Sequence, residues 1–423
     1  MSKQVIIMAG GKATRLKKEL NGLPKSLVKI GDKTVLDYQI ENIRRFSTQK
    51  IHFCLGFENK KILEFLNHNY KDLNYSYSIE TNPRGTYGAL LDSYDYLEDN
   101  IFVLFGDILS NFDIDNGFNK FKKSNSEIML VTRYTDHPED SDLINSDNNG
   151  RVISIEKKEK DNFNTLIGNS GLIFLKKNIL KKFSKDISKL DLMKDFVKTN
   201  LDVLDVSSSL SVDFIKDIGT EKRLYEQRNI IENFSLENKK VCFIDRDGTL
   251  IENQGDSNSI NEINFKPHAI ELLKFLQNNF YKIILITNQP GVAKGFFSIS
   301  ELEKFHDALQ LKLIKEGVKP LNAIFYCPHH PEGGYEGEDI TYKIKCDCRK
   351  PSLGMINSAI EEFNLNNSKF LFIGDSKADF QTGKQINAEV LIVKSKLTEK
   401  EYFKNIGVNI FDNLRDLKSQ IHI

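Results

Sequence analysis

Short apolar runs alternate with longer stretches of helical spacing along most of this chain. Runs rich in Val, Ile and Phe predict strands at Gln4–Met8, Ile51–Leu55, Tyr75–Ile79, Ile101–Phe105 and Glu127–Thr132. Between them, apolar residues at helical spacing predict helices at Thr34–Phe46, Lys60–Asn69 and Thr86–Leu97. Strands that alternate with helices in this way are typical of βαβ units, which build a doubly wound and mostly parallel sheet.

The alternation is interrupted once and then restarts. Residues 145–217 are richer in strand-like runs, and Thr220–Glu232 predicts a charged helix followed by a short polar link at Asn233–Asn238. A new strand then begins near Lys240, and later segments again alternate: helices at Ala269–Asn279 and Ser300–Glu316, strands at Val241–Ile244, Ile283–Ile286 and Phe370–Ile373. The sequence therefore predicts two α/β domains, at residues 1–235 and 239–423, each of ordinary domain size.

Composition excludes several classes of protein. With 59 Lys+Arg against 59 Asp+Glu the formal charge is zero, which argues against the nucleic-acid backbone as a main partner. No run approaches the roughly 18 apolar residues that a membrane helix needs, and the N-terminus has no signal-peptide pattern. Five cysteines, an odd number, fit a reducing compartment. We predict a cytoplasmic protein without nucleic-acid or membrane partners, and leave open whether it forms a homo-oligomer.

A glycine pair follows the first predicted strand. Gly10 and Gly11 would let backbone N–H groups approach a polyphosphate, and Arg15 and Lys25 would supply the positive charge that a triphosphate needs. The carboxyl ends of strands are where ligands bind to open α/β sheets. Taken alone, the pair equally fits a tight turn, because the segment matches neither the P-loop nor G-x-G-x-x-G.

Six motifs together resemble the signature of the sugar-1-phosphate nucleotidyltransferases, in the family's order and across residues 4–230. They are Ala9–Leu16 with Pro24–Leu27, Asn82–Thr86, Phe105–Asp107, Glu156-Lys157, Asn169–Gly171 and Asp217–Thr220. In that family, a sugar-1-phosphate oxygen attacks the α-phosphorus of a nucleoside triphosphate, and pyrophosphate leaves. Because no protein nucleophile is needed, catalysis consists of positioning and charge neutralisation.

The resemblance implies a role for each matching residue. Asp107 and Asp217 would hold Mg²⁺, while Arg15 would stabilise the leaving pyrophosphate and Lys25 the attacking sugar phosphate. Contacts with the sugar, the phosphates or the base are implied for Gly10, Gly11, Gly85, Glu156, Lys157 and Asn169. The second glycine of the family's G-x-G-T-R is Ala13 here, which tolerates positive φ poorly and leaves the base preference open.

Two aspartates closely follow the first predicted strand of the second domain. Residues i and i+2 of an extended backbone point the same way, so Asp245 and Asp247 converge, as a nucleophile and an acid/base require. An isolated D-x-D would equally suit metal binding alone. Further motifs follow in order, at Thr287–Gln289, Arg349–Pro351 and Gly374–Asp379. The four together resemble the haloacid-dehalogenase-like (HAD) phosphatases.

That resemblance implies a phosphoaspartyl mechanism. Asp245 would attack phosphorus, and Asp247 would protonate the leaving alcohol and then activate water. Thr287 and Lys350 would hold the phosphoryl oxygens, and Mg²⁺ would lie between Asp245, the backbone carbonyl of Asp247, and Asp375. The sequence before Thr287 leaves room for one helix but for no inserted cap domain.

Three cysteines and a histidine have the spacing of a metal site. Cys327 and His329 form C-x-H, and Cys346 and Cys348 form C-x-C after 16 intervening residues. Three thiolates and one imidazole suit a closed tetrahedral site for structural Zn²⁺, which would order a Gly-rich loop that has no apolar core. Free thiols are the alternative, and His330 competes with His329 as the fourth ligand.

This loop narrows the resemblance. Cys327–Gly333 followed by Cys346–Pro351 resembles the heptose-1,7-bisphosphate 7-phosphatases and the related histidinol-phosphatases, over roughly residues 241–393. The heptose branch is favoured because Arg349, beside Lys350, could bind the second phosphate of a bisphosphorylated sugar. Asn288, next to Thr287, is a further candidate for substrate binding.

The two resemblances fit one reaction sequence. A 7-phosphatase acting on heptose 1,7-bisphosphate yields heptose 1-phosphate, which belongs to the substrate class of the first domain. We therefore predict a bifunctional enzyme that makes an NDP-heptose for surface polysaccharide, with GTP as the favoured nucleotide and ATP as the alternative. Other readings are a histidinol-phosphatase-like enzyme with another sugar, a hexose as the activated sugar, and a non-catalytic first domain that senses nucleotide sugars.

Overall fold

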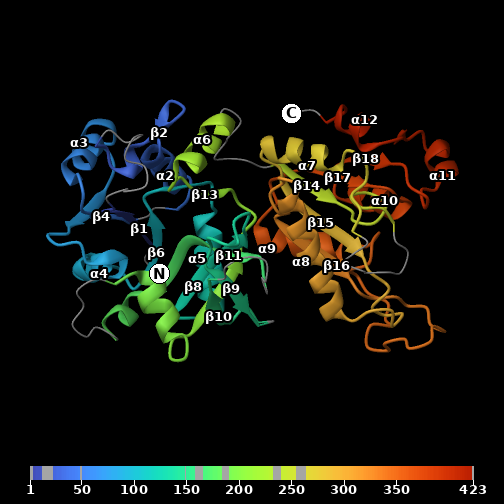
Figure 1. Ribbon diagram of the computed structural model, residues 1–423, viewed down its shortest axis with the longest axis horizontal. Helices are drawn as coiled ribbons and strands as arrows, with labels where there is room; N and C mark the ends of the chain where they lie inside the picture. Colours follow the sequence, from blue (N-terminus) through green and yellow to red (C-terminus); the bar gives the residue numbers. More distant parts are fainter. Residues whose placement is uncertain are drawn as a thin grey trace. The chain divides into compact units, whose positions relative to one another are not determined.

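The chain forms two compact units, which are shown in Figure 1. The computed structural model describes residues 3–11, 22–47, 50–147, 149–157, 165–182, 190–231, 240–253 and 263–421. The main segments are Met1–Arg133 with His137–Glu237 in the first unit, and Asn238–Ile423 in the second. Each unit is an α/β structure, so the predicted fold class is confirmed.

The first unit contains a mixed nine-stranded sheet with the order β10-β9-β11-β6-β1-β4-β5, to which β8 and β12 add on the β11 side. Four strands run parallel at one end: β6 (Asn100–Phe105), β1 (Gln4–Ala9), β4 (Lys50–Leu55) and β5 (Tyr75–Ile79). The others are β8 (Ile128–Tyr134), β9 (Leu143–Ser146), β10 (Val152–Glu156), β11 (Ile167–Lys176) and β12 (Val206–Leu210). Strand β11 runs antiparallel to β6, which makes this sheet mixed.

Residues of β1 pack alternately against two groups of helices, because successive strand side chains point to opposite faces. Val5 and Ile7 join one apolar cluster, and Ile6 and Met8 join the other. The first cluster includes α2 (Val35–Arg44), α3 (Asn59–Asn69) and α5 (Ile114–Ser124). The second includes α4 (Gly85–Asp92), the 3₁₀-helix η4 (Lys177–Lys181) and the π-helical segment η5 (Leu192–Val197). All six residues of β1 are buried, as a central parallel strand requires.

Short elements complete the first unit. A two-stranded antiparallel pair joins β7 (Ile108–Ser110) to β13 (Ile215–Asp217), and a second pair joins β2 (Lys29–Ile30) to β3 (Lys33–Thr34). The remaining helical elements are η2 (Lys25–Leu27), η3 (Tyr94–Tyr96), η6 (Lys198–Asn200) and α6 (Glu221–Ile230). The predicted helix Thr86–Leu97 is thus divided into α4 and η3, and α6 begins where Thr220 caps it through Arg223 N.

The second unit contains a fully parallel six-stranded sheet with the order β16-β15-β14-β17-β18-β19. The strands are β14 (Lys240–Ile244), β15 (Lys282–Asn288), β16 (Ala323–Cys327), β17 (Lys369–Gly374), β18 (Glu389–Val393) and β19 (Ile410–Phe411). From β14 the chain first builds outwards through β15 and β16, and then continues on the other side through β17. A ligand crevice is expected where the direction reverses, at the carboxyl ends of β14 and its neighbours.

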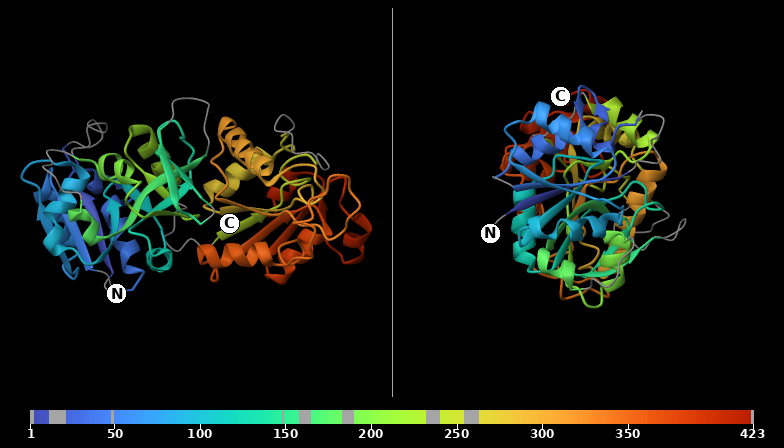
Figure 2. Two further views of the ribbon diagram at one scale, coloured as in Figure 1. Left: turned by 90° about the horizontal axis from the view of Figure 1, so that it is seen from below. Right: turned by 90° about the vertical axis from the view of Figure 1, so that its left-hand side faces the viewer.

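Helices cover both faces of this sheet (Figure 2). Cys242 and Ile244 pack with α7 (Ala269–Asn278), α8 (Ile299–Lys315) and α12 (Leu414–Lys418). Phe372 faces the opposite side, where it lies against Gly383 of α10 (Lys377–Gln385). The remaining helices are α9 (Gly354–Phe363) and α11 (Lys400–Asn405). Between β14 and β15 the described residues contain one helix, α7.

No helix in the described part of the chain combines the length and the hydropathy that crossing a bilayer requires.

Candidate active sites

Carboxylates gather at the carboxyl ends of two adjacent strands in the second unit. Asp245 directly follows β14, Asp375 directly follows β17, and Asp379 lies in the first turn of α10. One carboxylate oxygen from each of the three lies within 4.8 Å of the others, and all three residues are buried. Three buried carboxylates this close repel one another, so the site needs compensating positive charge.

Lys350 supplies part of that charge. Its Nζ lies 2.6 Å from Oδ1 of Asp245 and 2.6 Å from Oδ1 of Asp379, and it also donates to Ile286 O. Burial alone would lower the pKa of Lys350, but the two carboxylates outweigh it and raise that pKa above its usual range. Burial raises the pKa of Asp245 well above its ordinary value, although Lys350 opposes this effect.

Asp375 leaves an unsatisfied acceptor in this group. Its Oδ2 is buried and has no hydrogen-bond partner, and burial together with Asp379 raises the pKa of Asp375 to about 7. A Cβ on Gly248 would lie 2.2 Å from this oxygen, so a glycine is required there. Both oxygens of Asp379 are engaged, since Oδ1 accepts from Lys350 and Oδ2 from Ser376. The oxygen of this group that has no partner is therefore Oδ2 of Asp375, and a hard divalent ion fits this donor set.

The remaining predicted phosphatase residues line a cavity of about 270 Å³ at this edge of the sheet. Its lining includes Asp245, Asp247, Thr287, Asn288, Arg349, Lys350 and Asp375. The Asn288 amide makes two hydrogen bonds with the backbone of Lys350. Its Oδ1 accepts from Lys350 N at 3.0 Å, and its Nδ2 donates to Lys350 O at 3.2 Å. Asn288 thus positions Lys350. Arg349 donates to His329 O at 3.4 Å, which ties it to the cysteine-rich loop.

The structure brings together the predicted zinc ligands. Cys327, His329, Cys346 and Cys348 each contribute one ligand atom, all within 4.8 Å of one another. The three Sγ–Sγ distances are 3.0, 3.2 and 3.6 Å, and His329 Nδ1 lies 3.0 Å from Cys348 Sγ. A tetrahedral ion with Zn–S bonds of about 2.3 Å needs edges of about 3.8 Å, so the four atoms converge as such a site requires, with sulfur atoms closer together than those edges. His330 instead contacts the backbone of Glu332.

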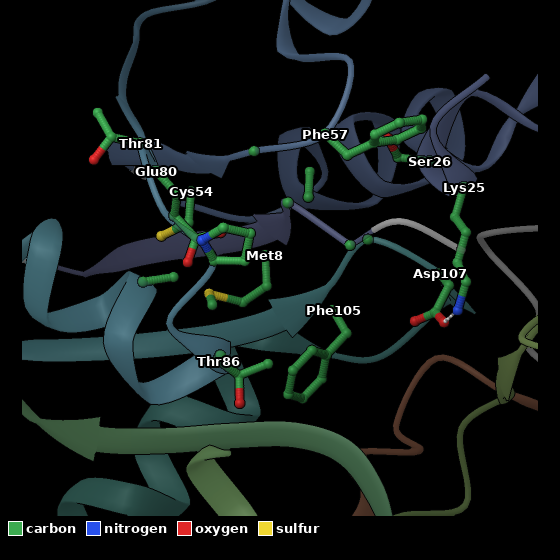
Figure 3. Close-up of a pocket in the computed structure, with 18 residues that line it drawn as sticks. Met8, Lys25, Ser26, Cys54, Phe57, Glu80, Thr81, Thr86, Phe105 and Asp107 are labelled. Atoms are coloured by element: carbon green, nitrogen blue, oxygen red, sulfur yellow. Dashed lines mark hydrogen bonds and ion pairs between the residues drawn. The ribbon is translucent and has the colours of Figure 1, made fainter. Parts of the chain in front are cut away.

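The first unit has a larger cavity, of about 680 Å³, at the carboxyl ends of its four parallel strands. Its lining includes Gly10 after β1, Gly56 after β4, Glu80 after β5 and Asp107 after β6. Predicted residues among the lining are Gly10, Gly11, Lys25, Gly85 and Asp107. Figure 3 shows Lys25 and Asp107 at one end of the cavity, and Glu80 and Cys54 towards the other.

Asp107 and Asp217 lie side by side because β7 and β13 pair directly after Asp107. Ile218 N donates to Asp107 O at 2.9 Å, and a Cβ on Gly219 would lie 3.1 Å from Asp217 Oδ1 and 3.7 Å from Asp107 Oδ2. Lys25 Nζ contacts Asp107 at 2.7 Å, and Arg223 contacts Asp217 at 2.7 Å. Burial opposes ionisation of Asp217, but Arg223 outweighs it and lowers the pKa of that carboxyl. Each aspartate therefore has one oxygen held by a cationic side chain.

Other predicted transferase residues lie apart from the lining of this cavity. Glu156 accepts hydrogen bonds from Ser154 at 3.0 Å and Asn145 at 3.4 Å, and the exposed Lys157 lies 4.0 Å from Asp140. Asn169 Oδ1 accepts from Gly171 N at 3.1 Å and shapes its own turn. Arg15 lies outside the described residues.

Three residues at these sites were not predicted from the sequence. Glu80 lines the transferase cavity, and burial raises its pKa. Its position directly after the predicted strand Tyr75–Ile79 could have identified it, because ligands bind at the carboxyl ends of such strands. Arg246 and Gln289 contact Asp247 in the phosphatase site. Both stand inside recognised motifs, but a sequence does not show where a buried side chain points.

Comparisons with known proteins match the two units separately. A family model described as nucleotidyl transferase matches residues 4–233, and one described as polynucleotide kinase 3 phosphatase matches residues 240–414. The D-glycero-beta-D-manno-heptose-1,7-bisphosphate 7-phosphatase of Haemophilus ducreyi is 37% identical over 159 residues, which are 38% of this chain and 82% of that protein. The protein of the same name from Pasteurella multocida is 36% identical over 185 residues, 43% of this chain and 97% of that protein. Among solved structures, HddC from Yersinia pseudotuberculosis is 24% identical with a TM-score of 0.48, covering 55% of this chain and all (100%) of that chain.

Proposed function

This chain belongs to the nucleotidyl transferase family through residues 4–233 and to the D-glycero-beta-D-manno-heptose-1,7-bisphosphate 7-phosphatase family through its second unit, and we propose that it catalyses two consecutive steps of heptose activation. The second unit removes the 7-phosphate of a heptose 1,7-bisphosphate. The first unit then transfers a nucleotidyl group to the resulting heptose 1-phosphate, giving NDP-heptose and pyrophosphate. The observation that carries this proposal is the presence in one chain of both cavities, each lined by its own family's residues.

In the phosphatase step, the two aspartates that follow β14 have different roles. An oxygen of Asp245 attacks phosphorus, the bond to the sugar oxygen breaks, and Asp247 gives that oxygen a proton. Asp247 then accepts a proton from water, which attacks phosphorus and releases inorganic phosphate and the Asp245 carboxylate. The Lys350 ammonium contacts Asp245 Oδ1, so it favours the ionised form that attacks, and it neutralises phosphoryl charge.

Mg²⁺ is the cation we propose for Asp245 and Asp375. The unpartnered Oδ2 of Asp375 and the adjacent carboxylate of Asp245 are hard oxygen ligands, which suit this ion. When bound, it would supply positive charge against the phosphoryl oxygens. Asp379 is left out of this set because its Oδ2 already accepts from Ser376 Oγ and from the backbone N–H groups of Asp375 and Ser376, so it holds this turn.

In the transferase we propose that Asp107 and Asp217 hold Mg²⁺ through their remaining oxygens, close to Lys25. The ion would supply charge neutralisation for the reacting phosphates, and Lys25 would orient the sugar phosphate. Arg15, Glu156, Lys157 and Asn169 stay predictions for phosphate and sugar contacts. Arg223, which holds Asp217, is a positioning residue.

We propose guanine as the base. Glu80 Oε2 lies 3.0 Å from where a Cβ of Gly10 would stand and 3.1 Å from that of Gly56, so both glycines let the backbone pack against this carboxylate. A carboxylate only accepts hydrogen bonds, and guanine presents adjacent N1–H and N2–H donors to it. Adenine presents a lone pair at N1, which a carboxylate repels. Because Glu80 lies away from the Lys25–Asp107 end, we place the base beside Glu80 and the phosphates beside Lys25.

Zinc is the ion we propose for Cys327, His329, Cys346 and Cys348. The ligand set leaves no position open for a substrate, so its role is structural. Because Cys348 directly precedes Arg349 and Lys350, an ordered loop fixes two residues of the phosphatase cavity. We propose that Arg349 binds the 1-phosphate of the bisphosphate.

One incubation tests the whole proposal. The protein is mixed with heptose 1,7-bisphosphate, Mg²⁺ and each nucleoside triphosphate in turn, and products are detected by mass. GDP-heptose, inorganic phosphate and pyrophosphate are expected with GTP. Nucleotide binding without pyrophosphate release would favour a sensing role for the first unit. Faster turnover of histidinol phosphate than of heptose bisphosphate would refute the assigned substrate.

A further inference from the structure

Asp247 is held by a buried network that the reaction as written does not use. Arg246, between the two aspartates, is only 2% exposed, and its Nε donates to Asp247 Oδ2 at 2.9 Å. Gln289 is 4% exposed, and its Nε2 donates to the same oxygen at 2.7 Å. One carboxylate oxygen of Asp247 thus accepts from two fixed donors.

The amide of Gln289 has only one orientation compatible with its neighbours. Its Oε1 accepts from Arg246 Nη2 at 2.8 Å, so Nε2 is the atom that faces Asp247. Nε2 also donates to Thr287 Oγ1 at 2.8 Å. Because the Thr287 oxygen accepts there, the hydroxyl hydrogen is free to donate elsewhere, and Thr287 lines the phosphatase cavity.

Arg246 is fixed in turn by α8. Its Nη1 lies 3.3 Å from His306 Nε2, and its Cζ lies 4.6 Å from the centre of the Phe305 ring. Arginine has donors only, so His306 Nε2 must accept and the ring must be neutral. Burial and the adjacent guanidinium both lower the pKa of His306 well below its usual value, in agreement with this assignment.

We propose that Arg246 and Gln289, oriented by His306, are positioning residues that commit Oδ2 of Asp247 to hydrogen bonding and leave Oδ1 as the oxygen that carries the catalytic proton. This inference rests on the proposed phosphatase activity. A proton on Oδ2 would point at the hydrogens of two donors, whereas a proton on Oδ1 meets neither of them.

The proposal gives each step of the reaction one proton path. When Asp245 attacks phosphorus and the phosphorus–oxygen bond of the substrate breaks, the proton leaves Oδ1 for the alcohol oxygen. In hydrolysis, water gives a proton to Oδ1 as it attacks phosphorus, and the bond to Asp245 breaks. Inorganic phosphate leaves, and Asp247 is protonated again on the same oxygen. The carboxyl need not rotate between the two steps.

Leaving-group dependence separates positioning from a merely structural role. We compare wild type, Gln289→Met and the control Gln277→Met, whose glutamine hydrogen-bonds the backbone of Lys319. The substrates are an alkyl sugar phosphate and p-nitrophenyl phosphate, whose acidic phenol leaves without protonation. For the sugar phosphate, we expect Gln289→Met to slow single-turnover cleavage by about 10²-fold, a usual contribution of a general acid. With p-nitrophenyl phosphate, it should release one phenol per site close to the wild-type rate and then turn over slowly, because hydrolysis still needs Asp247.

Variants of His306 provide an independent readout should Gln289→Met not fold. His306→Leu removes the acceptor for Arg246 and should show the same selective loss, while His306→Gln keeps an acceptor and should recover most of the rate. Equal losses on both substrates without a phenol burst, or no loss at all, would overturn the proposal. Wild type that released phosphate from neither substrate would instead overturn the proposed function on which the inference rests.

Discussion

Replacing Asp375 with asparagine should stabilise the second unit in the absence of divalent metal, although the same change should abolish phosphate release. Asp375 is 3% exposed and its Oδ2 has no partner, so the folded state holds the ionised carboxylate at a cost. Burial raises its pKa from an ordinary value of 3.8 to about 7 in the folded protein. This pKa difference of about three, at about 1.4 kcal/mol per pKa unit, corresponds to a free energy of about 4 kcal/mol.

The sign of the pH dependence follows from the raised pKa. The folded state binds the proton of Asp375 more tightly than the unfolded state does. The stability that this proton contributes is therefore fully present below a pH of about 4. It is lost as the pH rises from about 4 to about 7. Asparagine carries no charge, so the stabilising effect of Asp375→Asn should be small at pH 4 and reach about 2–4 kcal/mol at pH 8.

Hydrogen exchange measures this effect in the second unit alone. Amide protection in β14 and β17 is followed with and without Mg²⁺, in wild type, Asp375→Asn and the exposed-site control Asp339→Asn. Without metal at pH 8, only Asp375→Asn should gain protection. Adding Mg²⁺ should protect wild type but leave Asp375→Asn unchanged. The reasoning is refuted if Asp375→Asn is no more protected than wild type at pH 8, or if the two share one pH dependence.

Three further changes have distinct expected results. Gly248→Ala places a Cβ 2.2 Å from Asp375 Oδ2 at a φ of +82°, so it should cost about 1–3 kcal/mol and eliminate phosphatase activity, as urea denaturation and phosphate release would show. Glu80→Gln replaces one acceptor with a donor, so the ratio of kcat/KM for GTP over ATP should fall by at least about tenfold; an unchanged ratio would place the base elsewhere. A strong zinc chelator, or Cys348→Ser, should lower phosphate release while pyrophosphate release persists; full phosphatase activity with no zinc detected by elemental analysis would contradict a structural ion.

Periodicity sufficed for the long elements of the fold. The predicted strands Gln4–Met8 and Phe370–Ile373 lie between parallel neighbours, where a strand covered on both faces is mostly apolar. Short elements gave no such signal. Strands β7 and β13 have three residues each, and their pairing depends on contacts between positions 108–110 and 215–217, which are far apart in the sequence. This pairing nevertheless brings Asp107 beside Asp217.

Motif spacing predicted which side chains reach a strand's end, but not what each one contacts there. The structure brings together Asp245, Lys350 and Asp375, as expected. Asp245 and Asp375 follow the neighbouring strands β14 and β17, and Lys350 contacts Asp245. Asn288 lines the cavity, so its substrate contact stays a prediction, but the motif did not show that its amide also holds the backbone of Lys350. Such partners depend on rotamers and on the folding of residues some 60 positions away, which no local pattern records.

Sequence patterns also did not predict the polar side chains that hold the site residues in place. Arg246 and His306 are 60 positions apart, and each alone resembles an ordinary surface residue. Both are buried because they contact each other, and Arg246 also donates to Asp247. The spacing of the zinc ligands left His329 and His330 as alternatives, and it is the course of the loop that turns His330 towards Glu332.

The central claim is that one chain carries two independent sites for consecutive reactions. Asp245→Asn and Asp107→Ala test it most directly when phosphate and pyrophosphate are both measured in an incubation that contains heptose 1,7-bisphosphate, added heptose 1-phosphate and GTP. We expect Asp245→Asn to stop phosphate release while heptose 1-phosphate supplied directly still yields pyrophosphate, and Asp107→Ala to do the reverse. If either single change silences both reactions in a protein that remains folded, the account of two separate sites is contradicted.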